Sequence, residues 1–387
     1  MSTYDEAPEV DPTSGRRVVR CRHGEECGAC SGLGFEYGAQ IARKQRILGT
    51  ALGHYRSLSR AAVLPCVPSP EIEGYRNRAK MAVGMSKYEP TKLGYFGAGT
   101  RNIVDAPECR VVRPELAETL GELRRLLRSG PRFPRELRHV DVRCGSDPRR
   151  QHLTLVVRSR EMPRLPIDAV AKACRFVDGI SVNLNPSPGP QVIRGPVEHQ
   201  WGAREVYVDV GDLSLRVSAN SFFQVNLSML ETIQASMADF LGDGDSLLDL
   251  YSGVGTHGLA LAKRFRRVTG IEGVRSSVAD ARATIKRFKL RHVSVVPKPV
   301  ERSLNAVRDA EPDAVILNPS RAGAKEEVLD ALALSPARKI VYLSCEPKTL
   351  SRDLDRLVSN RLKLVSVQPL DMMPQTHQVE AMALLRR

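Results

Sequence analysis

One cysteine of this chain comes just after a short apolar segment, as a nucleophile at the end of a β-strand would. Residues 340–343 are apolar, Cys345 follows them, and Pro347 cannot extend a strand ladder. We expect a helix to begin near Thr349. Ligands and chemistry in open α/β sheets collect beyond the carboxyl ends of the strands. Cys345 is therefore either a nucleophile at such an end or a buried, inert thiol.

Other side chains with chemical potential follow other apolar runs. Asn318 and Arg321 come at the end of one run, and His377 and Glu380 lie in the loop before the final run. An arginine there can bond a carbonyl oxygen or a phosphate, and an amide can contact a cofactor. A thiol with a separate carboxylate forms a recognisable pair of nucleophile and base. His377 is either part of this site or structural.

A glycine loop near the middle of these runs has the spacing of a nucleotide-binding turn. Gly253, Gly255 and Gly258 form G-x-G-x-x-G after the apolar run 246–252, and we expect them to open a helix. Glu272 closes the next run, where a carboxylate can accept hydrogen bonds from ribose hydroxyls. The residues by themselves fit NAD, FAD or S-adenosylmethionine.

The composition is that of a folded protein with a polyanionic partner. Of 387 residues 42% are hydrophobic and 26% are charged, and 58 Lys plus Arg against 44 Asp plus Glu give a net charge of +14. This excess favours nucleic acid as the partner, with a merely basic protein as the alternative. No apolar run approaches the roughly 18 residues of a membrane span, and the acidic N-terminus has no signal core. We expect a cytoplasmic protein.

Three cysteines near the N-terminus have the spacing of a metal or cluster site. Cys21, Cys27 and Cys30 are separated by short segments that contain glycine. Clustered thiols in a cytosolic chain favour a metal over disulfides. A site with four thiolates needs one more ligand, for which Cys109 is the candidate. Its competitors are Cys66, Cys144 and Cys174. The spacing fits zinc and an iron–sulfur cluster equally.

The apolar pattern divides the chain into four parts. We expect a flexible tail at 1–17 and a cysteine-rich segment with a helix at 18–62. Residues 63–205 read mainly as strands and turns. Residues 206–387 begin with a hairpin at 206–218, continue with alternating strands and helices, and end with a second hairpin. This pattern predicts a mainly parallel sheet with an added antiparallel strand.

Within residues 63–205, one segment in which basic and other side chains alternate places three cations on one side of an expected strand. Arg76, Arg78 and Lys80 are two residues apart, so they share one face at the strand period. Such a row can follow the phosphates of a nucleic acid. A solvated edge strand would show the same pattern.

Five motifs together resemble the RNA uracil-5-methyltransferase family, which uses S-adenosylmethionine. The resemblance covers roughly residues 18–387 and rests on FFQVN, DLYSGVG, NPSRAG, LSCEPKTLSRDL and DMMPQTHQVE, in this order. The early cysteines with Cys109 resemble the branch that carries a 4Fe–4S cluster and methylates uridine in 23S ribosomal RNA. The TRAM domain of some members is not expected here. Glu346 stands where the family often has Asn, and a carboxylate beside a thiol disfavours the thiolate.

The resemblance implies a fold and a mechanism. The fold is a C-terminal Rossmann-like methyltransferase domain at 206–387 with a mostly parallel seven-stranded sheet, preceded by an iron–sulfur segment and a β-rich α+β domain that binds RNA. The Cys345 thiolate attacks uracil carbon 6, carbon 5 takes the methyl group, and Glu380 removes the carbon 5 proton. Arg321 stabilises charge on a uracil carbonyl.

The implied site residues fall into three sets. The cofactor is expected at Gln224, Tyr251, Thr256, Glu272 and Asn318, and a 4Fe–4S cluster at Cys21, Cys27, Cys30 and Cys109. The RNA contacts expected are Arg321, Arg76, Arg78 and Lys80. We expect the cluster to be structural, because it lies far from Cys345 in the sequence. RNA is the expected partner, rather than DNA or a membrane, and the expected state is a monomer.

Two other functions compete with this interpretation. A catalytically idle RNA-binding or ribosome-assembly protein would share the basic charge, but it has no use for Cys345 with Glu380. A nicotinamide-dependent oxidoreductase would use the glycine loop and would leave Cys345 and the clustered cysteines without a shared task. The same methylation on transfer RNA is a third possibility that the sequence leaves open.

Overall fold

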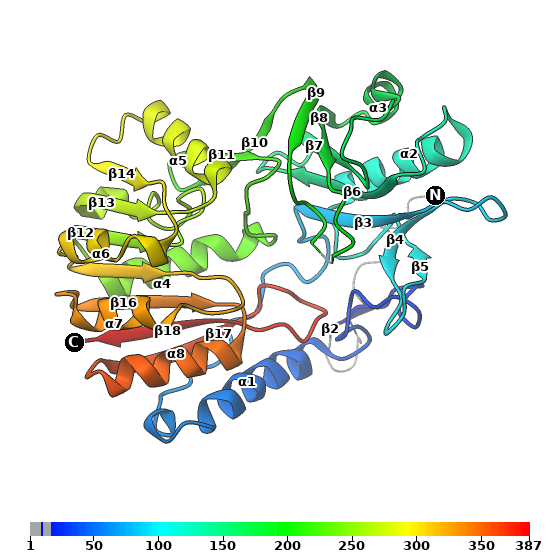
Figure 1. Ribbon diagram of the computed structural model, residues 1–387. Coiled ribbons are helices and arrows are strands. Elements are labelled where there is room, and N and C mark those ends of the chain that lie inside the picture. The colour runs from blue at the N-terminus through cyan, green and yellow to red at the C-terminus, as the bar shows by residue number, and fades with distance from the viewer. Residues whose placement is uncertain (1–8, 11–16, 190) are drawn as a thin grey trace.

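The computed structural model describes residues 9–10, 17–189 and 191–387, so most of the expected tail at 1–17 lies outside the described residues. Two seven-stranded sheets form the two halves of the molecule, and helix α1 (Tyr37–Gly53) runs beneath the C-terminal one (Figure 1). Two short strands, β1 (Glu9–Val10) and β2 (Arg17–Val18), pair near the N-terminus. No helix in these ranges is both long and apolar enough to cross a membrane.

The central sheet is antiparallel except at one strand pair. Its order is β5-β4-β3-β6-β7-β8-β9, and β7 and β8 are parallel because helix α3 (Ile167–Ala173) crosses between them. Helix α2 (Pro114–Ser129) buries Leu116, Leu120 and Leu123 in the same core as the sheet. The strands are Arg78–Gly84 (β3), Lys92–Phe96 (β4), Ile103–Asp105 (β5), Leu137–Cys144 (β6), Gln151–Val157 (β7), Val177–Leu184 (β8) and Val197–Gly202 (β9).

The C-terminal sheet confirms the expected α/β fold. Its order is β14-β13-β12-β15-β16-β18-β17, with five parallel strands followed by β18, which is antiparallel to both of its neighbours. The strands are Gly244–Leu250 (β12), Phe265–Ile271 (β13), Val293–Val296 (β14), Ala314–Leu317 (β15), Lys339–Ser344 (β16), Lys363–Leu370 (β17) and Glu380–Arg386 (β18).

Helices cover both faces of this sheet. They are Leu230–Leu241 (α4), Arg275–Arg287 (α5), Leu304–Asp309 (α6), Glu326–Leu334 (α7) and Pro347–Ser359 (α8). Short 3-10 helices are Arg56–Leu58 (η1), Leu227–Met229 (η2), Ala262–Arg264 (η3) and Val300–Arg302 (η4).

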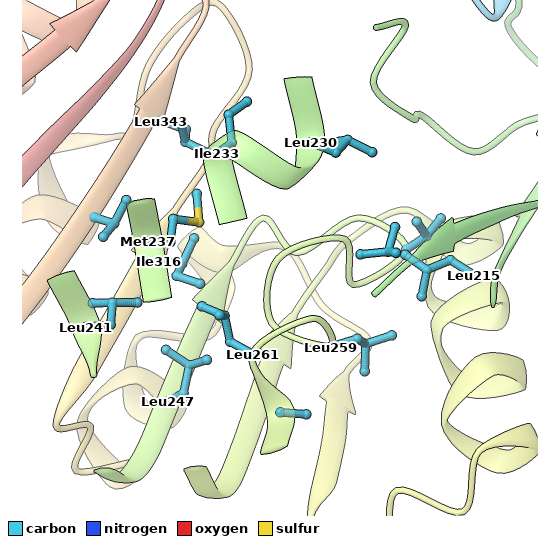
Figure 2. Packing of buried hydrophobic residues seen from close by; sticks show 14 of the residues in the cluster. Leu215, Leu230, Ile233, Met237, Leu241, Leu247, Leu259, Leu261, Ile316 and Leu343 are labelled. Carbon is cyan, nitrogen blue, oxygen red and sulfur yellow. The ribbon is translucent and has the colours of Figure 1, made fainter. Parts of the chain in front are cut away.

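Successive strand residues point to opposite faces and so build two cores. Leu247, Ile316 and Leu343 pack with α4 on one face (Figure 2). Leu248 and Tyr342 pack on the other face, with helices α7 and α8. Because apolar residues occupy both faces of these strands, the runs read as continuously apolar in the sequence.

The hairpin expected at 206–218 is present as β10 (Glu205–Val210) and β11 (Leu213–Ser218). Gly211 turns between them with φ +57°, a left-handed value that glycine adopts without strain. Leu215 and Val217 are buried in the core that α4 shares with the C-terminal sheet. The hairpin therefore packs with the C-terminal sheet.

The helix after Cys345 begins earlier than the sequence suggested. Its first residue is Pro347, and the side chain of Glu346 caps it by accepting a hydrogen bond from the Lys348 N–H, so the expected start near Thr349 was wrong. Proline is favoured at the first helical position because its fixed φ suits a helix and its missing N–H would have no partner there. Glu346 thus has a structural task beside the thiol.

The glycine loop does not open a regular helix, contrary to expectation. Gly253 and Gly255 have φ values of +57° and +89°, which a right-handed helix does not allow. The chain makes turns instead, with single helical hydrogen bonds from Leu259 to Gly255 and from Leu261 to His257. The loop therefore follows β12 as a series of turns, and most of its residues are buried.

The N-terminal segment packs against the C-terminal domain. Helix α1 confirms the expected helix at 37–52, and its Leu48 and Leu52 join the core beside α8. The Lys44 ammonium pairs with the Asp371 carboxylate, and these side chains are 1% and 0% exposed. Tyr37 donates a further hydrogen bond to Asp371 at 2.8 Å. The segment is thereby fixed to the chain just after β17.

The buried pair of Lys44 and Asp371 gives the first prediction. Lys44→Met removes the charge partner but leaves the carboxylate inside the protein, so the free energy of unfolding should fall by about 3 to 5 kcal/mol. Urea unfolding monitored by circular dichroism measures this change. Lys363→Met, at an exposed position, is the matched control. Equal free energies of unfolding for the two variants would contradict a stabilising role of the pair.

Candidate active site

The pairing of β18 with β16 brings the predicted nucleophile and base together. Ser344 lies opposite Ala381 in this antiparallel pair, so the next residues outward along the two strands are Cys345 and Glu380. Both side chains are half-buried. They stand at the carboxyl end of the parallel strands, where the sequence predicted the chemistry.

The electrostatics of this pair suit acid–base chemistry near neutral pH. Burial raises the pKa of Glu380 to about 7, while the charge of Arg321 acts in the opposite direction. Burial also raises the pKa of the Cys345 thiol, the Glu380 carboxylate adds to this effect, and the charge and hydrogen bond of Arg321 lower it. A carboxylate with a pKa near 7 is well matched to a general base.

Arg321 connects three elements around the thiol. Its guanidinium donates to Gln378 Oε1 at 3.0 Å, and its carbonyl oxygen accepts a hydrogen bond from Thr349 Oγ1 at 3.1 Å. The side chain itself is exposed. The loop after β15, the start of α8 and the loop before β18 are thus held around Cys345.

The residues expected at the cofactor lie at the ends of adjacent strands. Glu272 is 9% exposed, and its carboxylate accepts hydrogen bonds from the N–H groups of Gly253 and Val274, at 2.8 and 2.6 Å. Asn318 is half-buried after β15, where its N–H donates to the Leu250 carbonyl at the end of β12. The Glu272 carboxylate therefore contacts the glycine loop directly, and Asn318 lies beside the end of β12, which precedes the loop.

Of the other three expected cofactor residues, Tyr251 and Thr256 belong to the start of this loop, whereas Gln224 comes from another segment. Tyr251 has φ +58° and donates its hydroxyl to Glu301 at 2.8 Å. Thr256 is buried, and its carbonyl accepts a hydrogen bond from Gln234 of α4. Gln224 is half-buried before α4, and its carbonyl accepts a hydrogen bond from Asn77 of the central domain.

Asp249 is a polar residue of this region that sequence reasoning missed. It is 2% exposed, one oxygen accepts from the Gly258 N–H at 2.9 Å, and its Oδ1 has no partner among the described residues. Burial raises its pKa to about 7. A carboxylate near the end of a buried, otherwise apolar strand was the signal available in the sequence.

The four predicted cluster cysteines come together in space. Cys21, Cys27, Cys30 and Cys109 line one small cavity. Burial raises the pKa of Cys30 to about 12, and the charges of the other three thiols add to this. No group of three or more His, Cys, Asp or Glu side chains in the described ranges is arranged to hold a single metal ion.

The three competing cysteines lie elsewhere. Cys66 is near the pair of Lys44 and Asp371, Cys144 contacts the carbonyl of Asn77, and Cys174 is buried in the central core. Burial raises the pKa of each to about 12. The structure thus groups Cys109 with the early cysteines.

The three cations expected on one strand face do not form a row that is free to bind phosphates. Arg76 lies over the Tyr75 ring at 5.7 Å, and its charge acts to lower the pKa values of Cys27, Cys30 and Cys109, against the larger effect of burial. Arg78 pairs with the buried Asp141. Lys80 is exposed. The alternative of a solvated edge strand is wrong, because β3 lies between β4 and β6.

The cysteine segment touches the loop that leads to Glu380. Gly32 donates its N–H to the Gln375 carbonyl at 2.9 Å, and the His377 N–H donates to Ser31 Oγ at 3.0 Å. Gln40 of α1 donates to the Gln375 side chain at 3.0 Å. The cysteine-rich segment therefore contacts the loop before β18, although it lies far from Cys345 in the sequence.

Comparisons with known proteins agree with this geometry. Residues 196–387 match the family described as tRNA (Uracil-5-)-methyltransferase. An uncharacterized RNA methyltransferase of Thermosynechococcus vestitus is 31% identical over 97% of this chain and 86% of its own. A 23S rRNA (uracil(1939)-C(5))-methyltransferase of Pseudomonas fluorescens is 32% identical over 95% of this chain and 80% of its own.

A solved structure has the same fold. It is a tRNA (uracil-54, C5)-methyltransferase of Pyrococcus abyssi in complex with S-adenosyl-L-homocysteine. It superposes with a TM-score of 0.75 at 26% identity and covers 93% of this chain and 86% of its own. The chain therefore belongs to the RNA uracil-5-methyltransferase family and is an S-adenosylmethionine-dependent RNA methyltransferase.

Proposed function

We propose that the protein forms 5-methyluridine in RNA through a temporary covalent bond between Cys345 and carbon 6 of the uracil ring. The observation that carries this proposal is the register that sets Cys345 beside Glu380, with Arg321 acting on both. A thiol and a separate base are the two groups that activation of uracil carbon 5 requires. The target base must leave its stack to reach them.

The steps follow from the charges of these groups. The Cys345 thiolate adds to carbon 6, and the electron pair of the ring double bond moves towards the carbonyl at carbon 4. Arg321 stabilises this negative charge. Bound S-adenosylmethionine supplies the methyl group for carbon 5. Glu380 then takes the carbon 5 proton, the ring double bond forms again, and the thiolate leaves.

The glycine loop fits S-adenosylmethionine. At Gly253 no atom stands within 4 Å of the place where a Cβ would be, so a ligand can approach the backbone closely. Each Glu272 oxygen accepts one N–H and keeps capacity for a ribose hydroxyl. Gln224, Tyr251, Thr256 and Asn318 complete the proposed cofactor site.

The cysteine cavity fits a 4Fe–4S cluster held by Cys21, Cys27, Cys30 and Cys109. Four thiols around one cavity are the donor set of such a cluster. The guanidinium of Arg76 offsets part of their negative charge. The contacts of Ser31 and Gly32 with the catalytic loop support a role in positioning that loop.

The proposed substrate is 23S ribosomal RNA, because a relative at 32% identity acts on it by name. Transfer RNA is the second candidate, favoured by the name of the solved structure at 26% identity. In either case the central domain at 63–205 would contribute to RNA binding, and the enzyme would act as a cytoplasmic monomer. Mapping of 5-methyluridine by mass spectrometry in cells with and without the gene separates the two substrates.

The covalent step gives a prediction with two variants. Cys345→Ala should bind S-adenosylmethionine but yield no methylated RNA, whereas Cys144→Ala, at a thiol outside the site, should keep activity. Glu380→Gln should accumulate a protein–RNA adduct that survives denaturing electrophoresis, because proton removal is blocked after methyl transfer. The double variant Cys345→Ala/Glu380→Gln should form none. Full activity of Cys345→Ala would refute the mechanism.

Proton removal by Glu380 also predicts a pH dependence. Only the carboxylate accepts a proton, and its pKa lies at about 7, so decay of the adduct should slow as the pH falls through this value. Well below pH 7 the rate should drop about tenfold per pH unit. Rapid-quench measurements on wild-type adduct would show this limb. A decay rate that stays constant from about pH 6 to 8 would argue against this base.

The cluster proposal predicts the metal content. Protein prepared without oxygen should be brown and contain iron and acid-labile sulfide, and Cys109→Ser should lose most of both. Cys174→Ser removes a buried thiol outside the cavity and should keep them. A colourless wild-type protein that holds one zinc ion would overturn the cluster assignment.

A further inference from the structure

A groove of about 830 Å³ lies between helix α1 and the start of helix α8. Its lining includes Pro347 and Lys348, so it begins within three residues of the catalytic Cys345. Arg43, another lining residue, acts by its charge on the pKa of His377 in the catalytic loop. The groove therefore borders the two segments that carry the nucleophile and lead to the base.

The lining of the groove combines cations with apolar surface. Arg43, Arg46 and Lys348 are exposed, whereas Ala51 and Pro347 are buried. None of the three cations has a carboxylate partner among the residues that the structure describes. Such cations gain more from an anionic ligand than cations that already have an ion-pair partner.

Two further residues shape the groove. The ring of Tyr55 is half-buried and lines the groove beside the apolar residues. Glu346 also lines it, but its carboxylate accepts a hydrogen bond from the N–H of Lys348 and caps α8. This cap directs the acidic group to the helix start, and the three cations remain available to a ligand.

We propose that this groove binds the RNA strand that flanks the target uridine. Phosphates would pair with Arg43, Arg46 and Lys348, and a base or ribose would lie against Tyr55 and the apolar floor. Cationic grooves with an aromatic side chain are typical sites for single-stranded nucleic acid. The proposal rests on the proposed function, which requires the target base to leave its stack while the neighbouring nucleotides stay bound.

The groove lies where the strand next to the flipped uridine would leave the active site. A nucleotide next to the flipped uridine must leave the active site along the surface close to Cys345. The groove starts there and follows α1 from Arg43 towards His54. Phosphate contacts fix the position of a strand without reading its sequence, so we expect the groove to contribute affinity and not base specificity.

The test compares RNA binding by two charge-matched double variants of the full chain. Arg43→Gln/Arg46→Gln removes two cations from the groove. Arg291→Gln/Arg338→Gln removes two exposed cations just before β14 and β16, at the opposite end of the parallel strands. The probe is a fluorescein-labelled single-stranded RNA of mixed sequence and about 15 nucleotides. Fluorescence anisotropy gives the Kd between about 50 and 200 mM KCl.

The groove variant should bind this RNA about tenfold more weakly, and its plot of log Kd against log salt should lose about 1.4 from its slope. The control should match the wild type. Lys348→Gln should weaken binding by a smaller factor in the same direction. Unchanged binding and slope of the groove variant, or equal losses in the control, would overturn the proposal.

Two measurements separate this proposal from the proposed function. S-adenosylmethionine binding by calorimetry and the melting temperature should be the same in all variants, which shows that each one folds. If the wild type methylates RNA and the groove variant binds RNA normally, only the groove assignment is wrong. If the wild type neither binds nor methylates RNA, both proposals are wrong. Preferential binding of an acidic peptide to the groove would also overturn the RNA assignment.

Discussion

The structure depends on the antiparallel insertion of β18 between β16 and β17. This pairing sets Ser344 opposite Ala381 and so brings Glu380 beside Cys345. Strand side chains alternate between faces, so a slip of one residue would turn the carboxylate to the other side of the sheet. The apolar residues of β18 are buried on both faces, which fixes this register because any slip would also disturb both cores.

The same pairing places two acidic groups together, and the ionised form of each disfavours the ionised form of the other. A thiol and a carboxyl group share a partly buried site, and burial raises the pKa of each, so neither group is easily charged alone. Arg321 opposes this effect, because its charge favours the ionised form of both groups. Its bond to Gln378 and its carbonyl bond with Thr349 hold it at the edge of the site. Perturbed pKa values of this kind are common where a protein performs acid–base chemistry.

The N-terminal segment holds the loop between β17 and β18 through several polar contacts. Asp371 receives Lys44 and Tyr37 at the start of the loop, and Gln375 receives Gly32 and Gln40 in its middle. A loop supported only by its two strands would sample several conformations, and Glu380 would follow it. Hydrogen bonds thus join the cysteine-rich segment and helix α1 to the loop before β18, although the sequence separates them widely.

Local patterns in the sequence determined most of the fold, and the resemblance to a known family supplied the candidate site residues. The helix at 37–52, both hairpins, the mostly parallel sheet and the placement of Cys345 at a strand end all follow from periodicity and short motifs, which report contacts between near neighbours. Only the tertiary structure placed Arg76 at the cysteine cavity, made Glu346 a helix cap, kept the glycine loop from forming a helix and joined Gly32 to Gln375. Those outcomes depend on which distant segments pack together, and no periodic pattern along a single chain encodes that choice.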